Sequence, residues 1–163
     1  ISSKYILKNN NLKFPLTSSA LKINNKMPMN IFSRIKKYFL GKLKRKKILI
    51  LGLAYKEGVA DTRKSPTETL FNNLEQERAI VDLHDPLVKF WPEKNLEVKK
   101  NFPNLGNYDV IVIAVMNEAY KKINFEYLNK IRKRLLIFDT VNLFKEKKYL
   151  KLKKNIKIIF FGK

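Results

Sequence analysis

Five short apolar runs, separated by stretches with helical patterning, do most to constrain the fold of this chain. They cover residues 48–51, 80–83, 110–115, 135–138 and 156–161; Asp82 and Lys157 interrupt the second and the fifth, and the other three are unbroken. Unbroken apolar runs of this length are typical of parallel strands covered on both faces, because a strand with one wet face alternates polar and apolar side chains. Strands that alternate with helices predict an α/β fold with a doubly wound parallel sheet.

The segment after the first run has the signature of a helix N-terminus. Ser65 is placed to be the N-cap, Pro66 fits the first helical position, and Glu68 stands where it would complete a capping box. The spacing predicts a helix over 66–77 with Leu70, Phe71 and Leu74 on one face. Its first turn points free N–H groups at the preceding loop, which favours an anion there.

A second helical pattern precedes the sheet. Its apolar positions recur every four residues, at Met27, Ile31, Ile35 and Phe39, with Pro28 in the expected first turn and Gly41 at the end. We expect a partner helix to cover this apolar face, and hence association of the isolated chain. Residues 42–46 are mostly basic, which predicts a solvated linker.

The remaining elements follow from weaker patterns. We expect a loop or short turn over 87–91, a short edge strand over 96–98, and helices over 125–133 and 143–150.

The chain carries a formal net charge of +21, from 35 basic and 14 acidic residues. One interpretation is a surface for nucleic acid or an anionic membrane. The other is the lysine, asparagine and isoleucine bias of an AT-rich genome, and the scarcity of arginine favours it. Binding of nucleic acid would require arginine and aromatic side chains gathered on one face. Lysine is instead spread along the whole sequence, so nucleic acid is not expected as a partner.

Cysteine is absent and His84 is the one histidine. A disulfide framework, a cysteine nucleophile and a multi-histidine metal site are therefore excluded within these residues. No apolar run is long enough to span a membrane, and no signal peptide is recognised. We expect no membrane partner and a cytoplasmic location.

Polar side chains follow four of the expected strands and would converge on one edge of the sheet, where ligands bind in such folds. They are Tyr55, Lys56 and Arg63, then His84 and Asp85, then Asn117 and Glu118, then Asp139 and Asn142. Residues 52–57 lack the second and third glycines of a dinucleotide fingerprint. The sequence therefore predicts a Rossmann-like layer that binds phosphate through cationic side chains and a capped helix.

Several of these residues also have a purely structural interpretation. Asp61 is expected to hydrogen-bond within its own loop, Asp85 to form a turn with Pro86, and His84 to be a strand-end residue. Tyr55 and Trp91 either stack on a ligand or complete the core. No catalytic triad, paired carboxylates or nucleophile stands out.

The motifs Gly-Leu-Ala-Tyr-Lys (52–56), Asp-Thr-Arg (61–63) and Ser-Pro (65–66), with Asp85-Pro86, resemble the C-terminal domain of the UDP-glucose/GDP-mannose dehydrogenases. The resemblance continues through Ala114-Val115, Tyr120, Phe138-Asp139 and Asn142, and residues 23–28 are similar to the end of that family's central helical domain. The sequences of the first loop and of the segment around Trp91 most resemble those of the bacterial N-acetylhexosamine-type enzymes.

The resemblance implies an NAD-dependent oxidation of a UDP-sugar to a uronic acid, with two NAD reduced, in polysaccharide biosynthesis. By this resemblance Tyr55 and Lys56 contact the substrate and Arg63 reaches NAD held mainly by an N-terminal domain. The position of Asn142 holds a substrate-contacting arginine in some members, so asparagine here points to a different sugar. The family's catalytic cysteine is expected upstream of Ile1.

The resemblance also implies a domain organisation. Residues 1–41 would end a central helical dimerisation domain, 42–46 would link it, and 47–163 would form the nucleotide-sugar-binding domain. On this interpretation the chain is part of a longer homodimeric enzyme and is inactive alone. A non-catalytic nucleotide-binding module remains the alternative, and so does a basic nucleic-acid-binding protein.

Overall fold

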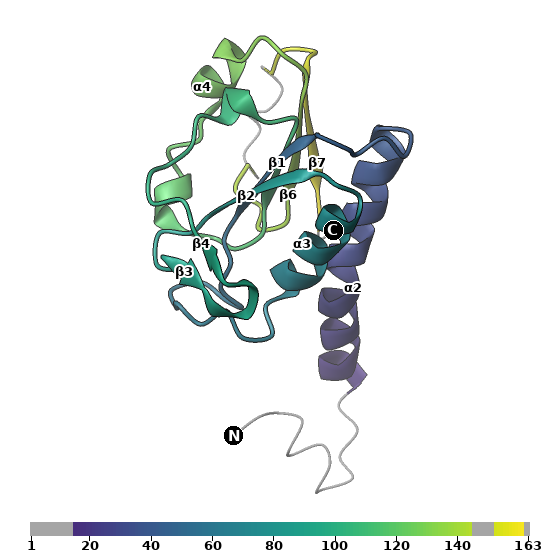
Figure 1. Cartoon of the computed structure of the whole chain (residues 1–163), viewed down its shortest axis with the longest axis vertical. Coiled ribbons are helices and arrows are strands. Elements are labelled where there is room, and N and C mark those ends of the chain that lie inside the picture. The colour runs from purple at the N-terminus through teal and green to yellow at the C-terminus, as the bar shows by residue number, and fades with distance from the viewer. Residues whose placement is uncertain (1–14, 145–151, 162–163) are drawn as a thin grey trace, which may run out of the picture.

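The computed structural model describes residues 15–144 and 152–161. A parallel sheet forms its centre, with helices on both faces (Figure 1). The strands are β1 (Lys47–Leu51), β2 (Ile80–His84), β5 (Val110–Ile113), β6 (Leu135–Asp139) and β7 (Ile156–Phe160). They lie in the order β2-β1-β5-β6-β7, and every neighbouring pair is parallel. The predicted Rossmann-like α/β class is confirmed.

The position of each strand explains its sequence pattern. The central strands β1, β5 and β6 are buried at nearly every residue, whereas the outer strands β2 and β7 are partly exposed. The strand order reverses between β1 and β5, because the chain passes from β1 to β2 on one side and then returns to β5 on the other. This switch point is where open α/β sheets form their ligand crevice.

Helix α3 (Pro66–Gln76) begins as predicted, with one correction. The Ser65 hydroxyl accepts a hydrogen bond from the Thr67 N–H at 3.2 Å, so Ser65 is the N-cap. The capping box is not closed, because the Ser65 N–H donates to the Thr62 carbonyl and the Glu68 carboxylate lies 3.5 Å from the Lys94 ammonium.

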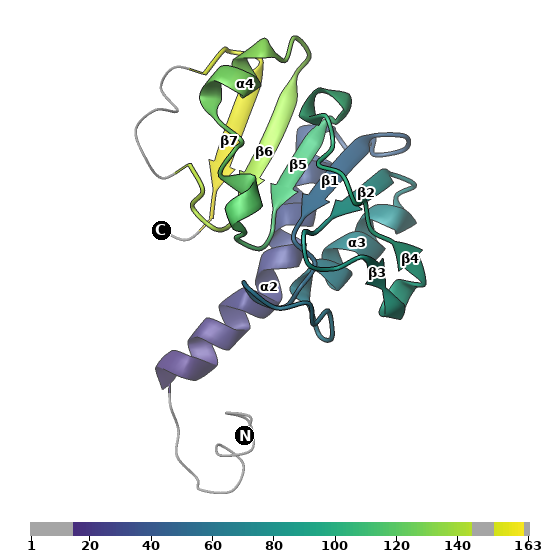
Figure 2. The same ribbon diagram turned by 90° about the vertical axis from the view of Figure 1, so that its left-hand side faces the viewer.

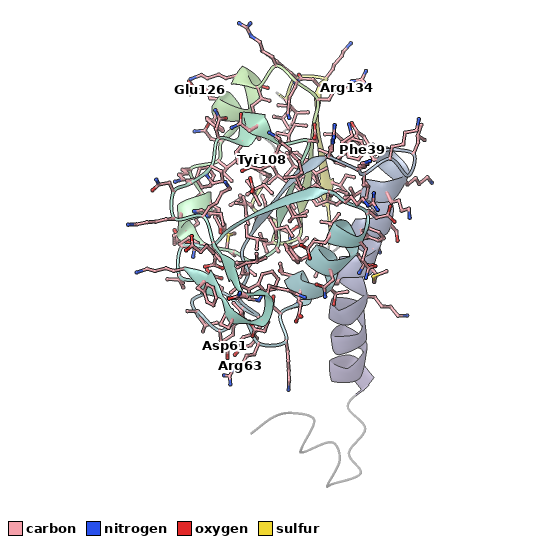
Figure 3. The ribbon with its side chains drawn as sticks, viewed as in Figure 1. Phe39, Asp61, Arg63, Tyr108, Glu126 and Arg134 are labelled. Atoms are coloured by element: carbon pink, nitrogen blue, oxygen red, sulfur yellow. The ribbon has the colours of Figure 1, made fainter. Side chains whose placement is uncertain are left out.

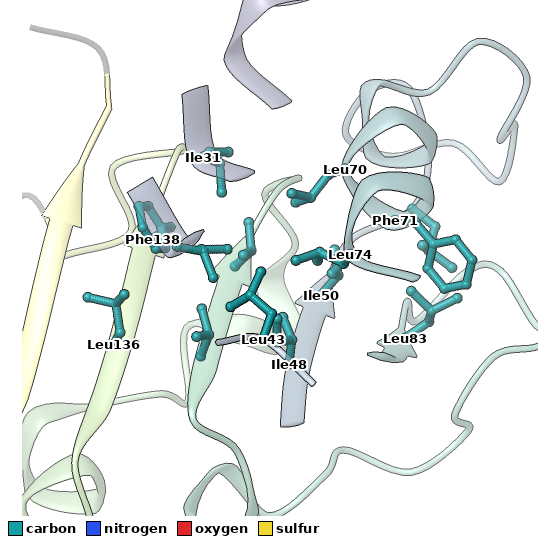
Figure 4. Close-up of a cluster of buried hydrophobic side chains, with 14 of the residues drawn as sticks. Ile31, Leu43, Ile48, Ile50, Leu70, Phe71, Leu74, Leu83, Leu136 and Phe138 are labelled. Carbon is teal, nitrogen blue, oxygen red and sulfur yellow. The ribbon is translucent and has the colours of Figure 1, made fainter. Parts of the chain in front are cut away.

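Helix α2 spans Pro15–Tyr38, so Pro28 lies inside the helix and not in its first turn. The prediction was wrong because the weakly patterned residues before Met27 continue the same helix. Helix α2 runs along the sheet beside α3 (Figure 2). Ile31 and Ile35 are 3% and 0% exposed and belong to the core formed with residues of the sheet and α3, where Figure 4 labels Ile31. The sheet of this same chain therefore covers the apolar face that was expected to need a partner helix.

The basic segment 42–46 is not a fully solvated linker. Leu43 is 1% exposed and belongs to the core on the α2 face of the sheet. The Lys46 ammonium lies 4.9 Å from the centre of the Phe39 ring. The connection between α2 and β1 is thus anchored in the core through Leu43.

The other face carries a second core, formed by the sheet, helix α4 (Phe125–Lys130) and the connecting loops. Helix α4 is shorter than expected, because Ile131 is already extended. Strands β3 (Phe90–Trp91) and β4 (Leu96–Glu97) form a separate antiparallel ribbon, so 96–98 is not an edge of the main sheet. The helix expected over 143–150 falls mostly outside the described residues.

In the part of the chain that the structure describes, no helix has the length and apolar character needed to cross a bilayer.

Candidate functional site

The loop between β1 and α3 (residues 52–65) lies at the switch point of the sheet. Gly52 begins this loop with a φ of +95°. A Cβ atom at Gly52 would lie 2.5 Å from the Cβ of Val115, so a larger residue would push the loops after β1 and β5 apart. The Tyr55 N–H donates to the Asp61 carbonyl at 3.0 Å and closes the loop on itself.

Asp85 joins this loop to the one after β2. Its Oδ2 accepts hydrogen bonds from the N–H groups of Leu53 at 2.8 Å and Ala54 at 3.4 Å. Its Oδ1 accepts from Leu87 at 2.9 Å and Val88 at 3.2 Å. Asp85 was expected to form a turn with Pro86, and its bonds to Leu87 and Val88 agree with that. Its bonds to the first loop were not predicted.

Tyr55 and Lys56 are presented to solvent at the tip of the first loop. Tyr55 is 47% exposed, and the Lys56 ammonium lies 5.4 Å from the centre of its ring. Lys56 makes no ion pair within the described residues. Tyr55 therefore does not complete the core, whereas Trp91 does, being 0% exposed and packed edge-on to Phe71.

Arg63 is paired within the loop. Its guanidinium donates to both carboxylate oxygens of Asp61, at 2.9 and 2.7 Å. The hydrogen bonds from the Arg63 side chain, followed by the one from its backbone N–H, lower the pKa of Asp61 to about 2. The same pairing with Asp61 raises the pKa of Arg63. The Arg63 side chain remains 81% exposed, so it projects outward at the carboxyl edge (Figure 3). Asp61 bonds within its own loop as expected.

Asn142 lies in the loop after β6 with a φ of +57°, a conformation that asparagine adopts more readily than most residues. The fully buried Asp139 shapes this loop by accepting hydrogen bonds from the N–H groups of Val141, Leu143 and Phe144 at 2.9–3.2 Å. Asn142 is exposed. Its position is set by Asp139, which binds the backbone on both sides of it.

His84 ends β2 in a buried aromatic cluster. The Tyr120 hydroxyl donates to the His84 carbonyl at 2.9 Å and lies 3.3 Å from His84 Nδ1. Burial, followed by the nearby Lys122, lowers the pKa of His84, although Asp85 acts in the opposite direction. Burial also raises the pKa of Tyr120, which keeps its hydroxyl protonated as a donor. These contacts agree with a strand-end role for His84.

A cavity of about 180 Å³ opens beside the first loop, between α2, the start of α3 and the carboxyl ends of β1, β5 and β6. Its lining is mostly apolar: Met27, Pro28, Ile31, Ala54, Tyr55, Pro66, Thr67, Leu70, Val112, Ala114, Val115 and Thr140. The hydroxyls of Thr67 and Thr140 are directed to the carbonyls of Gly52 and Ile113. The cavity therefore suits an apolar or aromatic group.

The structure brings only some of the predicted residues together. Tyr55 and Thr140 line the same cavity, so the loops after β1 and β6 border one space. Lys56 instead lines a hollow of about 10 Å³ with Asn117 and Asp85, while Arg63 and Asn142 line neither space. The contributions of Met27 and Pro28 were missed, because their spacing identified a helix face but not its neighbour.

The side chains at this site are suited to binding a ligand. Among residues 15–144 and 152–161, no group of three or more His, Cys, Asp or Glu residues is placed to hold a metal ion. The loop offers the exposed cations Lys56 and Arg63, an aromatic ring and the capped N-terminus of α3, as a phosphate-bearing ligand requires. Fold and site together define a Rossmann-like domain with a candidate nucleotide site at its switch point.

The comparisons with known proteins name the group more closely. A family model described as the UDP-glucose/GDP-mannose dehydrogenase family, UDP binding domain, matches residues 49–146. The match covers more than half of the chain, and the chain belongs to this family. The resemblance found in the sequence is thereby confirmed.

Curated relatives include dehydrogenases that act on two sugars. The chain is 30% identical over 145 residues to the UDP-glucose 6-dehydrogenase of Rickettsia conorii, covering 85% of this chain and 33% of that protein. It is 28% identical over 159 residues to the UDP-N-acetyl-D-mannosamine dehydrogenase of Methanococcus vannielii, covering 95% and 36%. The chain thus spans about a third of the length of these relatives.

Solved structures agree on the fold. The UDP-D-ManNAc dehydrogenase of Pyrococcus horikoshii matches with a TM-score of 0.64 and 28% identity, over 94% of this chain and 35% of that one. The NDP-N-acetyl-D-galactosaminuronic acid dehydrogenase of Methanosarcina mazei Go1 matches with a TM-score of 0.73 and 24% identity, over 96% and 34%.

Proposed function

We propose that this chain is the nucleotide-sugar-binding part of an NAD-dependent UDP-sugar 6-dehydrogenase. The observation that carries the proposal is the family match over residues 49–146, which includes the loop that presents Tyr55 and Lys56. The reaction oxidises the primary alcohol of the sugar to a carboxylate and reduces two NAD. This domain supplies binding groups, and a cysteine from another part of the protein supplies the nucleophile.

The roles proposed for individual residues follow their exposure and charge. Lys56, with no acidic partner in the described part of the chain, is free to contact a diphosphate, and Tyr55 offers a ring beside the apolar cavity. Asn142 would contact the sugar from the loop after β6. The two loops follow β1 and β6, which are separated in the sheet by β5 alone, so a common ligand would lie across the end of β5.

Arg63 is proposed to reach toward NAD held by another domain. Asp61 fixes the guanidinium through two hydrogen bonds but leaves most of it in solvent, so Arg63 is held ready and does not need to be ordered by the ligand. Residues 52–57 lack the glycines that let backbone approach a dinucleotide, which supports binding of NAD mainly outside this chain.

The proposed organisation places the end of a helical dimerisation domain at 1–41, a linker at 42–46 and the binding domain at 47–163. Homodimerisation through the helical segment, a cytoplasmic location and a part in polysaccharide biosynthesis belong to the same proposal. In support of the alternative, a non-catalytic nucleotide-binding module, these 163 residues contain no cysteine. Activity gained when the chain is joined to the NAD-binding and cysteine-bearing domains of a relative would exclude that module.

Calorimetric titration with UDP, GDP and NAD tests the proposal. We expect UDP to bind the wild-type chain and the affinity to fall about tenfold in Lys56→Ala, because a charge-assisted hydrogen bond contributes about 1.5–3 kcal/mol. Lys37→Ala, which removes an exposed lysine in the last turn of α2 that makes no ion pair within the described residues, is the control. Equal binding of UDP by both variants would contradict the role of Lys56, and tighter binding of GDP would contradict the choice of nucleotide.

A further inference from the structure

We propose that the edge of the sheet opposite to the candidate nucleotide site binds single-stranded nucleic acid. We call this edge the amino edge and define it by the segments that lead into the strands: 39–47, 76–79, 104–109, 130–134 and 152–155. Its basic residues are Lys42, Lys44, Arg45, Lys46, Lys47, Arg78, Lys130, Arg132, Lys133, Arg134, Lys153 and Lys154. Glu77 and Asp109 are the acidic residues of these segments.

The positive charge is unevenly divided between the two edges. At the carboxyl edge, segments 52–65, 85–89, 114–124 and 140–144 are nearly balanced, with Lys56, Arg63, Lys64, Lys89, Lys121 and Lys122 against Glu57, Asp61, Asp85 and Glu118. A bias of codon usage would add lysine to both edges alike. Composition therefore does not explain the excess at the amino edge.

Arginine is concentrated in the same place. The chain has six arginines, and four of them lie in the amino-edge segments: Arg45, Arg78, Arg132 and Arg134. Codon usage that favours lysine does not enrich arginine, whose planar fork matches phosphate. Nucleic-acid binding was expected to require arginine gathered on one face, and the amino edge meets that requirement.

Both acidic side chains of the amino edge are already engaged. The Glu77 carboxylate pairs with Lys36 at 2.6 Å. The Asp109 carboxylate accepts the Lys47 N–H at 2.8 Å and lies 3.4 Å from the Lys133 ammonium. Within the described residues, no ion pair engages Arg45, Arg78, Arg132 or Arg134. Their charge is available to a ligand.

Two hollows that share Lys133 give this edge a concave shape. One, of about 460 Å³, is lined by Tyr38, Phe39, Lys46, Asp109, Lys133 and Arg134. The other, of about 450 Å³, is lined by Asn104, Gly106, Asn107, Tyr127, Lys130, Ile131, Arg132 and Lys133. Figure 3 shows Phe39 and Arg134 at the end of the molecule opposite to Asp61 and Arg63, so a ligand here leaves the first loop uncovered.

The lining favours a flexible chain of phosphates and bases. Each hollow combines cations with a tyrosine, Tyr38 in one and Tyr127 in the other. Cationic grooves with aromatic side chains bind single strands through phosphate contacts and base stacking. Leu40, which is 86% exposed, is the feature that would favour a membrane, but a flat bilayer would not enter the hollows. We therefore commit to single-stranded nucleic acid.

Fluorescence anisotropy with a labelled mixed-sequence 20-nucleotide single strand tests the proposal on the whole chain over a range of salt. We expect binding whose logarithm falls linearly with the logarithm of salt. Arg132→Gln/Arg134→Gln should weaken binding about tenfold and make the slope shallower by about 1.4, since each single-strand phosphate contact contributes about 0.7. Lys89→Gln/Lys121→Gln removes the same charge at the carboxyl edge and should change the affinity less than threefold.

The other outcomes overturn the proposal. Equal losses in the two double variants would mean diffuse attraction to net charge. Binding to vesicles of anionic phosphatidylserine but not to the single strand would assign the edge to a membrane. Absence of binding at about 50 mM salt would remove the site, because electrostatic binding is strongest at low salt. Circular dichroism of each variant checks that the fold is retained.

Discussion

Asp85 is the residue on which both loops at the switch point depend. Its carboxylate accepts four backbone N–H groups, from Leu53, Ala54, Leu87 and Val88, while being 8% exposed. We expect Asp85→Ala to lower the free energy of unfolding by about 3 kcal/mol, because buried donors left without acceptors cost about 1–3 kcal/mol each. Urea denaturation measures this loss, and Glu118→Ala, at an exposed carboxylate, is the control. A loss below about 0.5 kcal/mol would mean that water replaces the carboxylate.

His84 gives the fold a pH dependence with a definite sign. The folded pKa of His84 is lowered, mainly by burial, so the unfolded chain takes up a proton at a higher pH than the folded one. Stability therefore falls as the pH drops through and below about 6.5, the unfolded pKa, and this contribution has a slope of at most about 1.4 kcal/mol per pH unit.

We expect His84→Gln to remove that slope between pH 7.5 and 5.5, a window in which most carboxylates stay ionised. Urea denaturation of both proteins at several pH values is the measurement. Parallel pH profiles for the two proteins would show that His84 takes up its proton equally in the folded and unfolded states.

At the scale of single residues, the sequence predicted contacts between near neighbours in the chain but not contacts between distant residues. Asp61 and Arg63 are two positions apart, and the bonding of Asp61 within its own loop was predictable from that spacing alone. The second role of Asp85 was not, because its partners Leu53 and Ala54 lie some thirty residues away in the chain. The roles of Tyr55, Lys56, Arg63 and Asn142 in binding remain predictions.

Helix α2 is held by the sheet of its own chain, and its core side chains should therefore contribute to the stability of this domain. Ile35 is 0% exposed, whereas Lys37 on the same helix is exposed. We expect Ile35→Ala to lower the free energy of unfolding by about 3 kcal/mol, within the range for buried large-to-small changes, and Lys37→Ala by less than about 0.5 kcal/mol. Chemical denaturation that gave both variants the same stability would mean that α2 is not part of the cooperative unit.

At the scale of elements, strands were predictable where burial on both faces leaves an unbroken apolar run, as in β1 and β5. Helix boundaries were less so. Pro28 is a common signal for a helix start, and the sequence before it has too little apolar periodicity to show that the helix continues. Leu43 is a single apolar residue among lysines and arginine, and a local window does not show that it enters the core.

The whole molecule carries a large positive charge that opposes its compact state. With a formal net charge of +21, like charges repel one another most at low ionic strength. We expect the midpoint of thermal unfolding to rise by about 3–5 °C when sodium chloride is raised from about 0.05 to 0.5 M. Differential scanning fluorimetry measures the shift, and sorbitol at matched osmolality controls for general solute effects. A constant or falling midpoint would show that the charges are compensated locally.

The attachment of α2 has a mechanical consequence for the whole protein. The second half of the helix is packed on the sheet, while its first half projects beyond it (Figure 2). The helix has 24 residues, and a regular helix of that length measures about 36 Å. Because the packed half cannot turn without the sheet, the projecting half acts as a lever: a small rotation of the sheet becomes a larger sideways displacement at Pro15. A ligand that rotated the sheet by binding at the candidate nucleotide site would therefore also displace the Pro15 end of the helix, although that end does not contact the ligand.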